Sequence, residues 1–230
     1  MIPKLEFQFD KEKDLHNIWE TCNSKSDYGH NFKKDVTQNI LDICEDKDYK
    51  RCKKDLQKTM SPFYKNHLIN RTLEAFEKSW KDIGKEYFVR LEKITKRKIS
   101  FNEVNVYLTT SGRCPYNPHG KPVHFFINFF SNIPTALTIA GHELMHIHIH
   151  NTDYWTKIEN AIGYDKTHDL KEALTELLNL EFRDLWLADD FGYPGHTKLR
   201  KYISQQWNKN KDFEKLIELS IKWVKRNGIK

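Results

Sequence analysis

Apolar residues recur at helical spacing along the first 98 residues of the chain. After Pro62 they return at steps of three and four as far as Ile94, which predicts an amphipathic helix about six turns long. Two shorter helices are expected before it, one around residues 18–19 and one over residues 36–44. The apolar stripes of these helices favour the packed core of a helical bundle.

Two segments in the middle of the chain have the composition of β-strands. Residues 104–110 and 122–130 are rich in β-branched and aromatic side chains, which favour extended structure. Residues 111–121, rich in Gly, Pro and Asn, separate them. We therefore expect two strands joined by an irregular loop.

A largely apolar segment follows the second strand and predicts a buried helix. Asn132 can cap its first turn, Pro134 suits that turn, and no helix breaker occurs before Asn151. Apolar residues occupy most of its sides, as expected of a helix covered by a sheet. Three further helices are predicted, a largely apolar one over residues 168–187 and amphipathic ones over residues 196–207 and 212–226.

The two parts of the chain differ in their content of helix-breaking residues. Residues 1–98 contain two glycines and two prolines, whereas residues 99–230 contain seven and five. This shift predicts a helical N-terminal region over residues 1–98 and a second domain of helices and strands over residues 99–230. The fold class expected for the whole chain is α+β and mostly helical.

The overall composition predicts a soluble protein. Hydrophobic residues make up 38% and charged residues 30% of the chain, and no apolar run approaches the roughly 20 residues that a membrane-spanning helix needs. The first residues lack the apolar core and cleavage site of a secretory signal. The four cysteines form no CxxC pair, which is typical of reduced thiols. We therefore expect a cytoplasmic protein that contacts no membrane.

The net charge of +6 is unevenly distributed. Residues 1–98 hold 22 Lys+Arg against 17 Asp+Glu, or +5, and residues 99–230 hold 16 against 15, or +1. Basic residues also alternate with acidic ones, as on the solvated face of a helix. Nucleic acid is therefore not an expected partner.

Four histidines and one glutamate lie within residues 140–150. Three of these five residues, His142, Glu143 and His146, spell the motif HExxH. On a helix the two histidines lie on one face about 6 Å apart along the axis, so both imidazoles can bind one zinc ion. Glu143 can reach water at the ion without ligating it, which suits a general base that passes the proton to a leaving amine.

A catalytic zinc ion usually has three protein ligands and one open position, so two histidines leave the site incomplete. Glu172 is the preferred third ligand, because an acid in a largely apolar helix is costly unless it is paired or binds a cation. Glu176, one turn further along, is expected to accept the free N–H of a ligand histidine.

Two other histidines lie close to the motif. His150 is the alternative third ligand, although a straight helix would separate it from His142 by about 12 Å, so that the helix would have to break. His148 points away from the face that carries His142 and His146. We expect His148 to lie at the surface or to cap the helix.

The segments HELMH (142–146) and EALTE (172–176) resemble the signature of the gluzincin branch of zinc metallopeptidases, which is HExxH plus a downstream helix bearing ExxxD or a close variant. The resemblance covers residues 100–190 and implies a zincin-like metallopeptidase domain within residues 99–230. It also implies a short twisted sheet whose edge strand pairs with an extended peptide substrate. Residues 122–130 are the candidate for that strand.

The resemblance further implies zinc as the cofactor and a peptide or protein as the substrate. It assigns zinc binding to His142, His146 and Glu172, and the role of general base and acid to Glu143. Two positions depart from the pattern. Glu176 stands where the family has an aspartate, and His148 stands where its longer consensus has a hydrophobic residue.

Peptidases of this kind usually have a Tyr or His donor that stabilises the developing oxyanion. Tyr193 and His196, on the loop after the glutamate-bearing helix, are the candidates in this chain. Two rival functions remain open. One is a zinc hydrolase in which His150 completes the site, and the other is a non-catalytic helical binding protein in which the motif is accidental.

Overall fold

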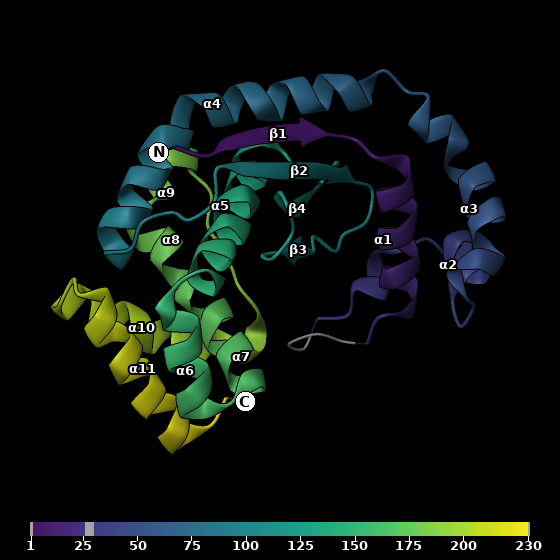
Figure 1. Ribbon diagram of the computed structural model, residues 1–230. Helices are drawn as coiled ribbons and strands as arrows, with labels where there is room; N and C mark the ends of the chain where they lie inside the picture. Colours follow the sequence, from purple (N-terminus) through teal and green to yellow (C-terminus); the bar gives the residue numbers. More distant parts are fainter. Residues whose placement is uncertain (1, 26–29, 230) are drawn as a thin grey trace.

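The computed structural model describes residues 2–25 and 30–229, which are mostly helical and include one small sheet (Figure 1). This agrees with the α+β class expected from the sequence. The strands are β1 (Lys4–Gln8), β2 (Glu103–Thr109), β3 (Tyr116–Asn117) and β4 (Val123–Asn128). Within the described residues, none of the helices combines the length and the apolar character needed to cross a membrane.

The sheet is mixed and has the strand order β1-β2-β4-β3. β1, β2 and β4 run parallel, and β3 pairs antiparallel with β4, with Tyr116 opposite Phe125. β2 and β4 are the two predicted strands. The prediction that residues 122–130 form the edge strand is wrong, because β3 occupies that edge.

Two strands lie in segments where none was predicted. β1 lies in the region expected to be helical, and its buried Leu5 stands between exposed Lys4 and Glu6. This alternation is a strand pattern, but it covers too few residues to be recognised without its partner β2. β3 lies within residues 111–121, which were expected to be irregular.

In the described part of the chain, four α-helices precede β2: α1 (Lys11–Asn23), α2 (Gln38–Cys44), α3 (Tyr49–Tyr64) and α4 (Leu68–Thr95). A short 3-10 helix, η1 (Phe32–Asp35), lies between the first two. α1, α2 and α4 correspond to the three predicted helices. α4 runs along β1 and reaches α5 (Ile133–His150), whereas α1, α2 and α3 gather at the other end of the sheet (Figure 1).

α5, predicted from the sequence, packs against both β4 and α4. Asn132 caps it as expected, since its Oδ1 accepts a hydrogen bond from the backbone N–H of Thr135 at 2.9 Å. On one side the helix is held closely at Gly141, where an added Cβ would meet Trp186 at 2.6 Å. The Tyr87 hydroxyl donates to the Gly141 carbonyl oxygen at 2.6 Å. These contacts fix the rotation of α5 and thereby the direction in which His142 points.

The prediction of a single helix over residues 168–187 is wrong, because this segment forms α7 (Tyr164–Leu174), α8 (Glu176–Glu181) and α9 (Arg183–Trp186). The first interruption is at Thr175. Its hydroxyl donates to the Glu172 carbonyl oxygen and accepts from Arg200, both at 2.7 Å. A threonine side chain that hydrogen-bonds the backbone in this way competes with continuation of the helix.

The remaining elements complete a helical layer around α5. They are α6 (Asp153–Ile162), the 3-10 helix η2 (Pro194–His196), α10 (Thr197–Lys209) and α11 (Phe213–Asn227). α10 and α11 confirm the two amphipathic helices predicted near the end of the sequence. They pack against each other, and α10 also contacts α7 and α8.

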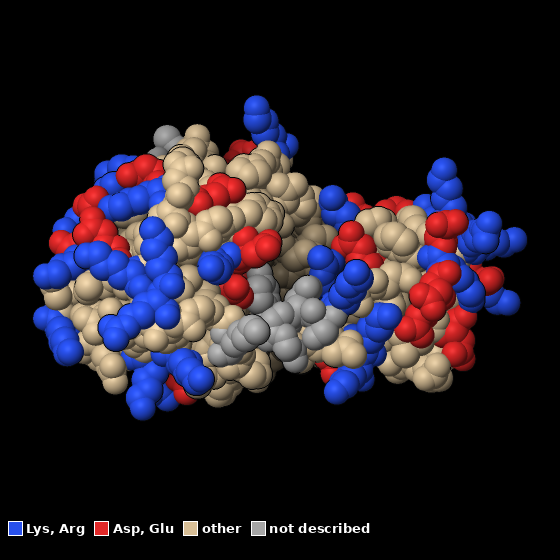
Figure 2. Space-filling model, turned by 90° about the horizontal axis from the view of Figure 1, so that it is seen from below, with Lys and Arg blue, Asp and Glu red and all other residues tan. Residues whose placement is uncertain are grey.

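The molecule has two unequal lobes, a smaller one formed by α1–α3 and a larger one formed by α5–α11 (Figure 1). The face shown in Figure 2 is hollowed between them. On this face Lys and Arg are spread over both lobes, with Asp and Glu among them. The residues predicted to bind the metal and to act as the base line a pocket where the larger lobe meets the sheet.

Candidate metal centre

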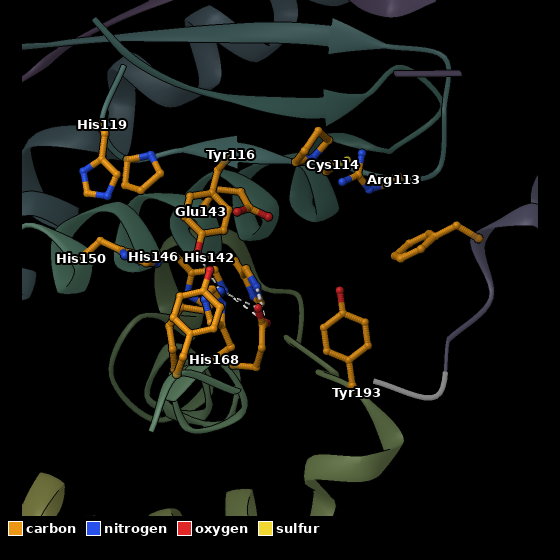
Figure 3. A pocket seen from close by; sticks show the side chains of 16 residues that line it. Arg113, Cys114, Tyr116, His119, His142, Glu143, His146, His150, His168 and Tyr193 are labelled. Carbon is orange, nitrogen blue, oxygen red and sulfur yellow. Dashed lines mark hydrogen bonds and ion pairs between the residues drawn. The ribbon is translucent and has the colours of Figure 1, made fainter. Parts of the chain in front are cut away.

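The three residues predicted as metal ligands converge from two helices. His142 and His146 lie one turn apart on α5 (Figure 3), and Glu172 lies on α7. Their Nε2 atoms are 3.3 Å and 3.2 Å, respectively, from Glu172 Oε2. The candidate ligand atoms of all three residues lie within 4.8 Å of one another. This group could hold a metal ion.

The protonation of His146 and Glu172 suits a cation. Burial lowers the pKa of His146 well below its usual value, which keeps the imidazole neutral. Burial would raise the pKa of Glu172, but Lys171 and hydrogen bonds with His142 and His146 hold it well below its usual value, so the side chain is a carboxylate. Neutral imidazole and ionised carboxylate are the forms in which these side chains bind metals.

His142 is the ligand candidate that must release a proton. Burial lowers its pKa, but Asp190 and Glu172 outweigh burial and raise the pKa well above its usual value. A cation at Nε2 would displace the proton that this atom shares with Glu172 Oε2. Metal binding at this group is therefore expected to release a proton.

Asp190 orients His142 from the other side of the ring. Its Oδ2 lies 2.9 Å from His142 Nδ1, so that Nδ1 carries the proton and Nε2 faces Glu172. The loop that bears Asp190 is itself fixed, because Asn179 Oδ1 accepts from the Asp190 backbone N–H at 2.7 Å and Arg200 donates to the Asp190 carbonyl oxygen. Burial would raise the pKa of Asp190, but His142 lowers it to about 2.

The prediction that Glu176 accepts the N–H of a ligand histidine is wrong. Glu176 follows the interruption at Thr175, and its Oε2 lies 3.0 Å from Arg200 Nη2. Asp190, from the loop after α9, makes the contact instead. No periodic pattern marks Asp190 in the sequence, so only the folded chain reveals it.

Replacing Asp190 with Ala is expected to weaken metal binding by about 10- to 100-fold, because the ring of His142 loses the acceptor that fixes its tautomer. Competition with a chromophoric chelator measures the affinity. Asp189→Ala is the matched control, since this neighbouring carboxylate is exposed and pairs with Arg183. If the Asp190 and Asp189 variants bound the metal with equal affinity, Asp190 would have no role in metal binding.

Glu143, the predicted general base, is buried beside His142 and lines the same pocket. Its Oε2 has no hydrogen-bond partner among the residues that the structure describes. Burial raises the pKa of Glu143 to about 7. A carboxyl group with this pKa can take up and release a proton near neutral pH.

A buried lysine adjoins the ligand group. Lys171 Nζ lies 2.7 Å from Glu172 Oε1, the oxygen that does not face the histidines, and donates to the Tyr116 hydroxyl at 2.8 Å. The Tyr116 hydroxyl is in turn 2.8 Å from His150 Nε2. The sequence contains a signal for this lysine, because it interrupts an apolar series just as Glu172 does.

His150, the alternative third ligand, does not join the group. Its Nε2 bonds the Tyr116 hydroxyl, and its ring stacks on Trp155 with centroids 3.6 Å apart. α5 continues unbroken from His142 to His150, whereas this alternative required the helix to break between these two residues. Burial lowers the pKa of His150 to about 3.

The other predicted side chains have separate surroundings. The prediction that His148 lies at the surface or at a cap is wrong, because it is buried against α4 and its Nε2 is 2.8 Å from Thr95 Oγ1. His196 is buried with its Nε2 2.8 Å from Asp169 Oδ1 and does not line the pocket. Tyr193 does line it, but it stands apart from the ligand histidines (Figure 3).

The ligand group opens into a pocket of about 430 Å³, and a second pocket of about 300 Å³ adjoins it. The two share part of their lining, so they form one continuous cleft. The shared residues are Phe32, Cys114, His142, Glu143 and Tyr193. Tyr116 lines the larger pocket (Figure 3).

The chain was compared with models of protein families, with curated proteins and with solved structures, and none of them matches it. The function must therefore be inferred from the residues of the cleft. In that cleft, His142, His146 and Glu172 could hold a metal ion, and the buried carboxyl group of Glu143 lies beside them.

Proposed function

We propose that this protein is a zinc-dependent peptidase with a zincin-like fold and a gluzincin-type ligand set. One observation carries the proposal. The nitrogen atoms of His142 and His146 and a carboxylate oxygen of Glu172 approach within 4.8 Å of one another. Glu143, whose Oε2 has no hydrogen-bond partner in the described part of the chain, lines the same cleft.

The donor set favours zinc over calcium and magnesium. Two imidazole nitrogens and one carboxylate oxygen form a three-ligand set typical of catalytic zinc, whereas calcium and magnesium prefer oxygen ligands alone. Bound there, zinc would supply Lewis acidity that polarises a carbonyl group and lowers the pKa of water. His142, His146 and Glu172 would hold it.

Glu143 performs the proton transfers in this proposal. Its carboxylate takes a proton from the water that adds to the carbonyl carbon of the peptide bond. The C–N bond then breaks, and Glu143 returns the proton to the leaving nitrogen. Asp190 keeps His142 oriented throughout, and burial of Glu143 excludes bulk water from the proton that it carries.

The substrate is proposed to lie in the cleft beside β3. The resemblance to gluzincins implies that an extended peptide pairs with an edge strand, and the edge next to β4 belongs to β3. Pro115, Tyr116 and Pro118 line the larger pocket at this point. Because proline has no N–H, only Tyr116 and Asn117 within residues 115–118 have a backbone N–H that could donate to a peptide.

A cytoplasmic location is part of the proposal. All four cysteines are free thiols, and three of them, Cys22, Cys44 and Cys52, are buried in α1, α2 and α3. Free thiols fit a reducing compartment.

The test combines metal analysis with peptide cleavage. Mass spectrometry of the purified protein should find about one zinc ion per chain, as expected of a single three-ligand site. Incubation with a peptide library should give products that disappear with a chelator and return with zinc. His142→Ala should lose both the zinc and the cleavage. A protein that takes up no zinc under metal-replete conditions would leave the motif accidental, as in a non-catalytic binding protein.

A further inference from the structure

Lys171 is an unusual neighbour for a metal centre. It is buried, with 2% of its side chain exposed, and lies next to the ligand Glu172 on α7. A buried ammonium group is costly unless it is paired, and a cation close to a metal site repels the metal. The contacts of Lys171 therefore need an explanation beyond charge balance at Glu172.

The two oxygens of Glu172 have different partners. Oε2 faces the Nε2 atoms of His142 and His146, whereas Oε1 is 2.7 Å from Lys171 Nζ. A carboxylate can bind a cation through one or both of its oxygens. In this structure one oxygen is directed at the ligand group and the other is engaged by an ammonium group.

The ammonium group is itself held in place. Lys171 Nζ donates to the Tyr116 hydroxyl at 2.8 Å and lies 4.7 Å from the centroid of the Tyr116 ring. The Tyr116 hydroxyl also contacts His150 Nε2 at 2.8 Å, and the ring of His150 stacks on Trp155. The network therefore runs from β3 through the end of α5 to α6, and it holds Lys171 through the Tyr116 hydroxyl.

We propose that Lys171 is a positioning residue that holds Glu172 Oε1, so that Glu172 offers the metal only Oε2. This inference rests on the proposed zinc centre. A single oxygen from Glu172 and two imidazoles make three ligands, which leaves a place for water and room for a fifth ligand during the reaction. A second oxygen from Glu172 would fill one of these places.

The wild-type protein provides the first test. Crystals loaded with zinc should show Glu172 Oε2 on the ion and Oε1 still within hydrogen-bond distance of Lys171 Nζ. If zinc were held by both oxygens, or if Lys171 moved away from Glu172, the proposed role of Lys171 would be refuted and the zinc centre would still stand. A protein that takes up no zinc would instead contradict the proposed function.

A variant provides the second test. Lys171→Met removes the ammonium group and keeps an unbranched side chain that is one atom shorter, so Oε1 becomes free to bind the ion. The X-ray absorption spectrum of the zinc-loaded variant should show one more oxygen neighbour than that of the wild type, and kcat should fall more than KM rises. Lys166→Met, at an exposed lysine of the same helix, should change neither. An unchanged number of neighbours in Lys171→Met would refute the proposal.

Discussion

Replacing Glu143 with Gln is expected to abolish peptide hydrolysis while zinc remains bound. The amide is nearly the same size as the carboxylate but cannot accept a proton from water. General base catalysis typically contributes about 10²- to 10⁴-fold to a rate, and the same group also protonates the leaving nitrogen. The loss should therefore lie at the upper end of this range or beyond it.

The measurement compares initial rates on one cleaved peptide with zinc content in the same samples. Asp189→Asn is a suitable control, because it also neutralises an acid at the cleft but one that is exposed and paired with Arg183. It should keep full activity. Turnover by Glu143→Gln at the wild-type rate would remove Glu143 as the base.

Zinc affinity is expected to fall far more in Glu172→Ala than in His150→Ala. Glu172 offers one of the three converging candidate ligand atoms. Removing its carboxylate should therefore lower zinc affinity by more than the roughly 10- to 100-fold expected when a group behind a ligand is removed. His150 is linked to Glu172 by hydrogen bonds through Tyr116 and Lys171 and is not itself a ligand candidate, so its loss should weaken zinc binding by about tenfold at most, at the lower end of that range.

Titration against a competing chelator gives both affinities. The reverse order would favour the rival hydrolase in which His150 completes the site. His148→Ala serves as a further control, because this histidine is near the motif but hydrogen-bonds Thr95 on the far side of α5. It should alter stability and leave zinc affinity unchanged in the folded protein.

The positions of the three candidate ligands were predictable because each has a local signal. His142 and His146 are one turn apart on a helix with a clear cap and no breaker, so their shared face follows from helix geometry alone. Glu172 stands out as an acid in an apolar helix. The structure brings these three together across two helices, as expected.

The partners of the ligands were not predictable in the same way. Asp190 reaches His142 from a loop 48 residues further along the chain, and its position depends on Asn179 and Arg200. The predicted contact of Glu176 with a ligand histidine requires the helix to continue past Thr175. The interruption there turned Glu176 toward Arg200, and it depends on a hydrogen bond from α10 that no local pattern encodes.

His148 shows why the direction of a side chain does not by itself predict exposure. Helical geometry correctly placed it away from the face of His142 and His146. That other side of α5 is covered by α4, where Thr95 meets His148. α5 is therefore buried on opposite sides, as its apolar composition indicated. A polar residue on such a helix does not indicate that its position is exposed to solvent.

The pairing of β1 with β2 also has a consequence for the order of events during synthesis. Lys4 lies opposite Glu103, so the first strand leaves the ribosome long before its partner exists. At the usual 5–20 residues per second, the delay is roughly 5–20 s. α1 to α4 can form in that interval, whereas the sheet against which α5 packs must wait for the middle of the chain.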